Sequence, residues 1–262
     1  MALIREIIEN IEELAPPSLQ EDYDNTAWQV APGGNFGESD AKGVLVCLDV
    51  TEAIIDEAQA KGCNLIISHH PLIFKPFTKL IGASYQQNCA IKAIQKGIGI
   101  YAAHTNLDNA KGGVNFKIAE KLDLRDLEWL DPKDANSGSG LVGNLPAPET
   151  EEGFLLRVKN IFRSKVLQHS PLRGMKVSKV AVCGGSGSFL LHNAIDKGAD
   201  VFLTGEISYH HFFDAKGIVA VAAGHYESEQ YTIELLAERL SRSFSSLKIV
   251  KTEINTNPIT YL

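Results

Sequence analysis

The fold of this chain is decided by two stretches that align without a gap, GVLVCLDVTEAIIDEAQAKGCNLIISHH (residues 43–70) and KVAVCGGSGSFLLHNAIDKGADVFLTGE (residues 179–206). Cys47 aligns with Cys183, and Lys61-Gly62 aligns with Lys197-Gly198. Each copy has the pattern of a strand, a turn, a helix, Lys-Gly and a second strand, and the glycine ends the helix in a left-handed conformation. The unbroken register and the shared cysteine favour duplication over the general likeness of any two βα units.

The likeness continues beyond these stretches and predicts the fold class. Lys96-Gly97 precedes IGIYAAHTNLD, and Lys216-Gly217 precedes IVAVAAGHYESE. Alternating strand and helix patterns are typical of an α/β protein with largely parallel sheets. We therefore expect two related, interlinked α/β domains, residues 1–125 and residues 126–262, with an approximate boundary. The second includes a linking segment, 126–175.

Three further segments carry local signals. Apolar residues at helical spacing predict a helix over residues 3–14, which Pro16 and Pro17 stop. The linking segment is rich in turn formers, so we expect loops around a minor strand there. The first half also has extra residues, beginning PLIFKPFTKLIGAS (residues 71–84), between its second and third strands.

Composition excludes several classes of protein. The chain has 262 residues, of which 44% are hydrophobic and 22% charged, as in ordinary globular proteins. Its net charge of −7 gives no general attraction to nucleic acid or to an anionic membrane, so we expect neither partner. No apolar run approaches the roughly 18 residues that span a bilayer, and the N-terminus lacks a secretory pattern. Four cysteines without a CxxC motif fit reduced, buried thiols, and we expect a cytoplasmic protein.

The ends of the predicted strands collect histidines and carboxylates. In open α/β sheets, ligands bind beyond the carboxyl ends of the strands. Spacings of four residues separate His104 from Asp108 and His225 from Glu229, which lets an imidazole and a carboxylate converge. Single histidines of this kind are usually hydrogen-bonded core or capping residues, but four at equivalent strand ends favour a metal site. The predicted ligands suffice for two divalent ions and are His69, His70, His104, Asp108, His225 and Glu229.

The same motifs carry a family resemblance. SHHPLIF, HTNLD, TGEISYHH and GHYESE, together with YDNTAWQVAPG near the start, resemble the Nif-three-like family over essentially the whole chain. Bacterial members of that family are often labelled GTP cyclohydrolase 1 type 2 homologues. The chain departs from the family pattern Trp-Asp-Asn-x-Gly-Leu, because Tyr23, Ala27 and Trp28 replace the Trp, Gly and Leu.

The resemblance implies two linked α/β domains, a dinuclear metal centre in the cleft between them, and a homohexameric ring. Carried over by motif, the family's ligands fall on the six residues named above. The metals would be Zn, Fe, Mn or Ni. A pair of divalent ions lowers the pKa of a water molecule and polarises a substrate, so the implied activity is metal-dependent hydrolysis of a small polar or nucleotide-like molecule. A non-catalytic ring that scaffolds partners, or stores or delivers metal, is the alternative.

Other candidates are less specific. Glu206 aligns with His70 and is expected to be buried near the metals, and His210 could bind substrate or carry protons; these two are the predicted catalytic residues. The glycine-rich turn Gly184–Gly187 could cradle a phosphate, but a tight structural turn is favoured. Asp24 and Asn25 either point into the cleft or form an Asx turn. Lys75 and Lys79 could steer an anionic ligand or simply be solvated.

Overall fold

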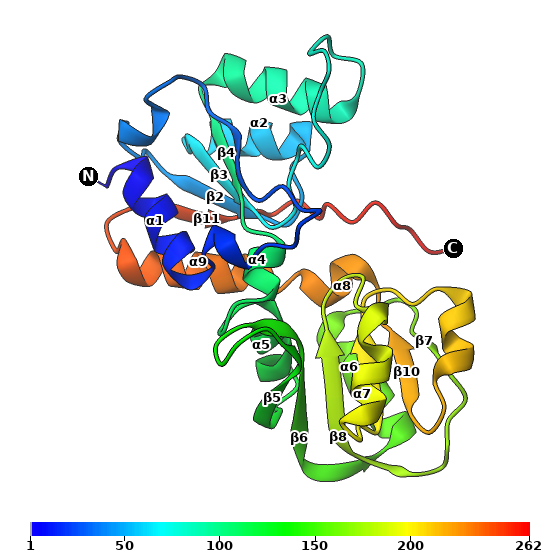
Figure 1. Ribbon diagram of the computed structural model, residues 1–262. Coiled ribbons are helices and arrows are strands. Elements are labelled where there is room, and N and C mark those ends of the chain that lie inside the picture. The colour runs from blue at the N-terminus through cyan, green and yellow to red at the C-terminus, as the bar shows by residue number, and fades with distance from the viewer. Residues whose placement is uncertain (1) are drawn as a thin grey trace. The chain divides into compact units, whose positions relative to one another are not determined.

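The chain forms two compact α/β units, each built on one sheet (Figure 1), in a computed structural model that describes residues 2–262. Unit 1 comprises the chain up to Leu107 together with Thr232–Thr260. Unit 2 comprises Asp108–Tyr231 with Tyr261–Leu262. The predicted α/β class is confirmed. The units divide the chain at a different place from the boundary expected at residue 125, since the C-terminal helix and strand group with the first unit.

Unit 1 is a five-stranded sheet with helices on both faces (Figure 1). Its strand order is β1-β4-β3-β2-β11, with every pair parallel except β1 and β4. The strands are β1 (Ala27–Val30), β2 (Val44–Cys47), β3 (Leu65–Ser68), β4 (Gly99–Ala102) and β11 (Ile249–Lys251). The helices are α1 (Ile4–Leu14), α2 (Glu52–Ala60), α3 (Tyr85–Lys96) and α9 (Thr232–Ser243), with short 3-10 turns η1 (Pro17–Leu19) and η2 (Phe36–Glu38). The helix predicted over residues 3–14 is therefore confirmed.

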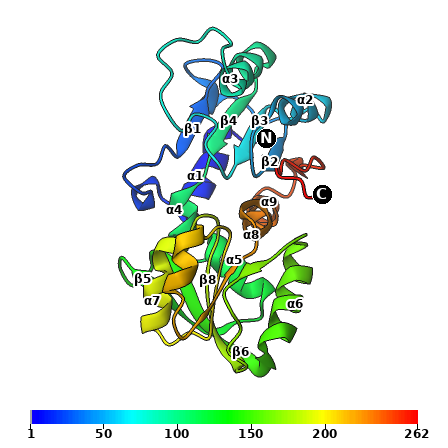
Figure 2. The same cartoon turned by 90° about the vertical axis from the view of Figure 1, so that its right-hand side faces the viewer.

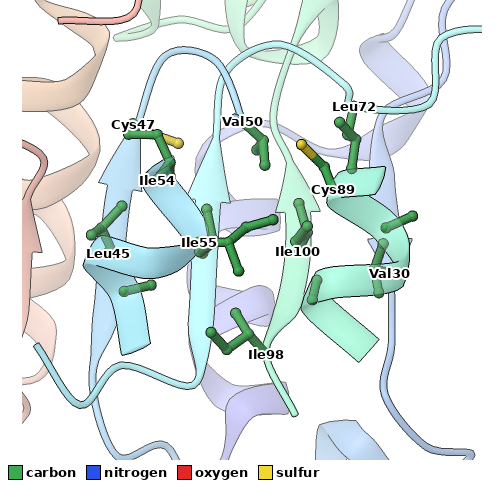
Figure 3. Packing of buried hydrophobic residues seen from close by; sticks show 14 of the residues in the cluster. Val30, Leu45, Cys47, Val50, Ile54, Ile55, Leu72, Cys89, Ile98 and Ile100 are labelled. Atoms are coloured by element: carbon green, nitrogen blue, oxygen red, sulfur yellow. The ribbon is translucent and has the colours of Figure 1, made fainter. Parts of the chain in front are cut away.

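The core of unit 1 lies between the sheet and helices α2 and α3 (Figure 3). Ile54 and Ile55 of α2 and Cys89 of α3 pack onto Leu45 and Ile100 of the strands, and all five are fully buried. Thr51 caps α2 by accepting the backbone N–H of Ile54. Burying such aliphatic side chains contributes about 1.5–3 kcal/mol each. The ends of these strands are therefore held rigidly.

Unit 2 contains a six-stranded sheet, with α6 and α7 on opposite faces (Figure 2). The strand order is β5-β6-β8-β9-β10-β7, in which β8, β9 and β10 run parallel. The strands are β5 (Arg125–Pro132), β6 (Gly138–Thr150), β7 (Gln168–His169), β8 (Lys176–Cys183), β9 (Val201–Thr204) and β10 (Val219–Ala222). The helices are α5 (Val114–Lys121), α6 (Glu151–Phe162), α7 (Leu191–Asp196) and α8 (His225–Glu229), with 3-10 turns η3 (Ser188–Leu190) and η4 (Tyr209–Asp214). The short helix α4 (Thr105–Asp108) carries the chain from unit 1 into unit 2.

The duplicated stretches fold alike, as the alignment predicted. Strand β2, helix α2 and strand β3 in unit 1 correspond to β8, α7 and β9 in unit 2. Gly62 and Gly198, which follow the two helices, have φ of 69° and 68°. A left-handed conformation at this position is accessible to glycine without steric cost, which explains the Lys-Gly pair in each copy.

The expectation of loops around a minor strand in the linking segment is wrong. Residues 126–175 contain most of the β5–β6 hairpin and the twelve-residue helix α6. The prolines of NLPAPET fall where the pairing of β6 with β8 is irregular, between Asn144 and Glu149, so they remove no ladder hydrogen bond. Thr150 then caps α6 by accepting the backbone N–H of Gly153.

Strand β1 was not expected in the polar N-terminal stretch, and it begins with strained backbone. Ala27 has φ of 74°, at the position where the sequence pattern of the resembled family has glycine. The left-handed region costs a residue with a Cβ about 1–2 kcal/mol. Ala27 in this conformation therefore stores backbone strain next to the Asp24-Asn25 motif.

We predict that Ala27→Gly stabilises the protein. Relief of the strain exceeds the entropy that glycine adds to the unfolded chain, so the net gain should be about 0.5–1 kcal/mol. Urea or thermal unfolding measures this gain. Ala31→Gly, at an exposed position without positive φ, is the control and should leave stability unchanged or lower it. A loss of stability in Ala27→Gly similar to that of the control would contradict the prediction.

Candidate metal centre

Three histidines of unit 1 meet at the carboxyl ends of two neighbouring strands. His69 and His70 directly follow β3, and His104 follows β4 by one residue more. The strands pair in parallel with Ser68 opposite Ala102, which brings the two strand ends side by side. The imidazole ring centroids are 4.9–5.4 Å apart, and one nitrogen from each ring lies within 4.8 Å of the others. These three residues can hold a metal ion.

The hydrogen bonds of these rings orient them for metal binding. His69 Nδ1 lies 2.8 Å from the carbonyl oxygen of Ala103, which can only accept, so Nδ1 carries the proton and Nε2 carries the lone pair. His70 Nδ1 lies 2.7 Å from Asp49 Oδ1, and His104 Nδ1 lies 2.7 Å from Asp24 Oδ1. Metal-binding histidines usually donate their second ring N–H to such a carbonyl or carboxylate.

The two aspartates are held as anions. Burial alone would raise the pKa of Asp24, but the hydrogen bonds and charge of His104, with hydrogen bonds from Thr105 and Asn25, outweigh burial and lower it to about 2. For Asp49, burial is likewise outweighed by His70, by Thr256 and by the charge of His69, and its pKa is lowered. Thr256 Oγ1 lies 2.8 Å from Asp49 Oδ2, so the C-terminal segment supports the carboxylate that orients His70.

Unit 2 contains a second group of candidate metal ligands, made of one imidazole and several carboxylates. His225 opens α8 and Glu229 closes it, and His225 Nε2 lies 3.2 Å from Glu229 Oε2. The spacing of four residues predicted this convergence. Asp108 is half-buried, and one of its carboxylate oxygens lies within 4.8 Å of one from Glu229. Glu229 is 4% exposed, so a cation would compensate the cost of burying these charges.

Glu206 is not buried, contrary to the sequence-based expectation. Its side chain is 54% exposed, because it follows the end of β9 on a surface loop. It still contacts the group: Glu206 Oε1 lies 3.1 Å from His225 Nδ1, and Ser186 Oγ donates to Oε2 at 2.7 Å. Ser186 was not singled out as a site residue, because its position in the glycine-rich turn suggested only a phosphate cradle or a structural turn.

His210 lies on the surface of unit 2. It is exposed in η4, and its ring neighbours are Tyr209 and Phe213, at centroid distances of 5.2 and 6.5 Å. His211 is exposed as well.

The glycine-rich turn is structural, as favoured. The N–H groups of Gly184, Gly185 and Gly187 donate to side-chain oxygens of Asn115, Ser228 and Thr204, at 2.9–3.0 Å. Donors already bound by the protein cannot cradle a phosphate without breaking these bonds. Gly185 has φ of 59°, and a Cβ there would lie 2.3 Å from Glu229 Oε1. The turn therefore makes room for the Glu229 carboxylate.

Asp24 and Asn25 have roles that the sequence left open. Asp24 accepts from His104 and Thr105, so it orients a candidate ligand. Asn25 Nδ2 donates to the backbone carbonyl of Ile73, in the extra loop of the first half. Neither Asp49 nor Thr256 was identified beforehand, because the contact between them joins residues 207 positions apart in the sequence.

Comparison with known proteins finds relatives that all belong to one family. The model of the family described as Duf34/NIF3 (NGG1p interacting factor 3) matches residues 2–258. The GTP cyclohydrolase 1 type 2 homolog of Lactococcus lactis is 34% identical over 252 residues, covering 94% of this chain and 95% of the relative. The protein of the same name from Streptococcus pneumoniae is 31% identical, covering 99% and 100%.

Solved structures extend the likeness. The Bacillus cereus protein related to NIF3 matches with a TM-score of 0.92 at 26% identity, covering 100% of this chain and 99% of that one. Reduced HcgD from Methanocaldococcus jannaschii matches with a TM-score of 0.79 at 30% identity, covering 97% and 98%.

We predict that Gly185→Ala weakens metal binding at Glu229. The new methyl group would displace the carboxylate oxygen and strain the turn, and such loss of ligand placement typically lowers metal affinity about 10–100-fold. Competition with a chromophoric chelator measures the affinity. Gly33→Ala is the control, because its Cβ would meet nothing within 4 Å. Equal affinity in both variants and the wild type would contradict the placement of Glu229 in the site.

Proposed function

The chain belongs to the DUF34/NIF3 family, and we propose that it binds two divalent metal ions and hydrolyses a small polar substrate with them. The observation that carries the proposal is the set of three imidazoles in unit 1 whose Nδ1 atoms are each engaged by an acceptor. That arrangement puts a lone pair on the Nε2 of His69, as metal ligation requires.

The proposed ligand set joins residues of both units. His104 directly precedes α4 and Asp108 ends it, and His225 and Glu229 lie at the two ends of α8. Imidazoles with carboxylates suit Zn, Fe, Mn or Ni. The ligands are therefore proposed to be His69, His70, His104, Asp108, His225 and Glu229, which together would hold two ions.

Bound ions would supply Lewis acidity and a water molecule of lowered pKa. The residues around them would then place the substrate and move protons. Glu206 is suited to accept a proton, because it is exposed to solvent and contacts both His225 and Ser186. We retain His210 as a substrate-binding candidate at the surface. The names of the bacterial relatives make GTP the first substrate to test.

We predict that wild-type protein reconstituted with Zn, Mn or Fe holds two metal equivalents per chain. His69→Ala combined with Glu229→Ala should lose metal, because it removes a buried ligand from each group. Elemental analysis after gel filtration measures the content. His169→Ala combined with His192→Ala, at two exposed histidines, is the matched control and should retain both equivalents.

Absence of metal from the wild type with all three ions would overturn the ligand assignment. Turnover of GTP or of phosphoesters by the loaded wild type, lost in the double variant, would support hydrolysis. Metal bound without any turnover across that panel would instead favour the non-catalytic alternative, a scaffold or a metal store.

We also propose that the chain assembles as a homohexameric ring in the cytoplasm. Unit 2 exposes Tyr209, Phe213 and Phe189 by 63–72%, and association would remove such apolar side chains from water. Among residues 2–262, no helix combines the length and apolar character needed to cross a membrane. Light scattering should give a mass near six times 28.5 kDa. A monomeric mass at micromolar concentration would contradict the assembly.

A further inference from the structure

The extra loop of unit 1 builds a pocket beside the imidazoles. Gly62 and Gly97 are separated by 35 positions, whereas the equivalent Gly198 and Gly217 are separated by 19. Most of the difference falls in residues 71–84, the long loop that leads into α3 (Figure 2). This loop and the first turn of α3 line a pocket of about 470 Å³ that is open to solvent. Cavities of that size hold small molecules.

The floor of the pocket is anchored to the core of unit 1. Leu72 is 5% exposed, and Ile73 and Phe77 pack against the buried cluster under α2 and α3. The backbone of Ile73 is held on both sides, since its N–H donates to Gln29 Oε1 and its carbonyl accepts from Asn25 Nδ2. A loop tethered in this way presents its remaining side chains in a fixed arrangement.

Two aromatic side chains on the pocket walls are exposed to solvent. Phe74 is 43% exposed and Tyr85 is 59% exposed, although burying such rings normally stabilises a protein. Their faces can stack on a planar ring, which is worth about 1–3 kcal/mol for a nucleobase. The wall therefore offers a surface for a flat aromatic group.

The charge of the pocket favours an anion. Lys75 lines it, as do the neutral side chains of Gln86 and Tyr85, and no carboxylate is among the described lining residues. Lys75 is the one charged side chain among these described lining residues, in a chain whose net charge is −7. A partner of opposite charge is attracted to such a site.

The pocket also adjoins the proposed ligands. Pro71, in its lining, follows His70 directly, and the Phe74 ring lies edge-on to the His104 ring at 6.3 Å. A ligand bound in the pocket would therefore lie beside the imidazoles.

We propose that this pocket binds a small anion that carries a planar aromatic ring, with the ring against Phe74 and Tyr85 and the negative charge near Lys75. This inference rests on the proposed function and assigns its substrate class. It adds a specificity pocket made by the loop that the second half of the duplication lacks.

The test compares three probes on the full-length, zinc-loaded protein by calorimetry. AMP carries ring and charge, adenosine carries the ring alone, and ribose 5-phosphate carries the charge alone. AMP should bind most tightly. Tyr85→Ala should lower the affinity for AMP and adenosine about tenfold and leave the affinity for ribose 5-phosphate unchanged. Tyr85→Phe should bind all three probes as the wild type does.

Lys75→Gln should lower the affinity for AMP and ribose 5-phosphate several-fold and reduce the salt dependence of their binding. Lys79→Gln is the matched control, because Lys79 is in the same loop but outside the lining. Metal content should stay at the wild-type value in all these variants.

The outcomes separate the two proposals. Two bound metals without binding of any probe, or with binding indifferent to Tyr85, would overturn the pocket assignment and leave the metal centre standing. Probe binding that depends on Tyr85 in a protein that holds no metal would support the pocket and overturn the metal centre. A change of oligomeric mass in Tyr85→Ala, without a change in probe affinity, would show that copies of the chain cover this surface and would overturn the inference.

Discussion

The in-register parallel pairing of β3 with β4 is the constraint on which the candidate metal centre depends. Ser68 lies opposite Ala102, so His69-His70 and His104 leave the sheet at one edge. The backbone continues this register past the strands, because the N–H of Ala103 donates to the carbonyl of Ser68 at 2.9 Å. A slip of one residue would reverse the faces of the side chains and separate the imidazoles. The fully buried aliphatic residues on these strands resist such a slip.

Hydrogen-bond partners around the three imidazoles fix the orientation of the rings as well as their closeness. Each ring is held through Nδ1 by a different partner: a carbonyl for His69, Asp49 for His70 and Asp24 for His104. These partners come from separate segments of the sequence. The orientation of these ligands therefore depends on the fold of unit 1 as a whole, because no single local motif contains all the partners.

The sequence predicted the α/β class, the duplicated units and the convergence of His225 with Glu229, because these follow from local periodicity and spacing. It could not identify Asp49 or Thr256, since their contact joins residues more than 200 positions apart. The turn-forming residues between 126 and 175 predicted loops where the structure has a hairpin and a helix. The strand forms despite Pro146 and Pro148 because they lie where the pairing of β6 with β8 is irregular. Glu206 was expected to be buried by analogy with His70, but solvent exposure depends on the covering segments and not on alignment.

Both halves place a histidine and a carboxylate four residues apart after a strand, but the histidines have different partners. In each, the strand is followed by alanine, then a histidine, then a carboxylate four residues later on a short helix. The equivalent backbone bond recurs, because the N–H of Ala223 donates to the carbonyl of Thr204 as that of Ala103 does to Ser68. In the second half, one extra residue, Gly224 with φ of 102°, precedes the histidine, and His225 contacts its own helix partner Glu229.

In the first half, His104 instead contacts Asp24, from the N-terminal motif. Asp108, the carboxylate equivalent to Glu229, is therefore not the hydrogen-bond partner that orients its own histidine. The duplication thus supplies two copies of a histidine–carboxylate helix, and added segments distinguish them. The N-terminal segment and the loop before α3 give unit 1 an orienting carboxylate and a pocket. Segments added to one copy of a repeated βα unit can thus give its histidine a hydrogen-bond partner that the other copy lacks.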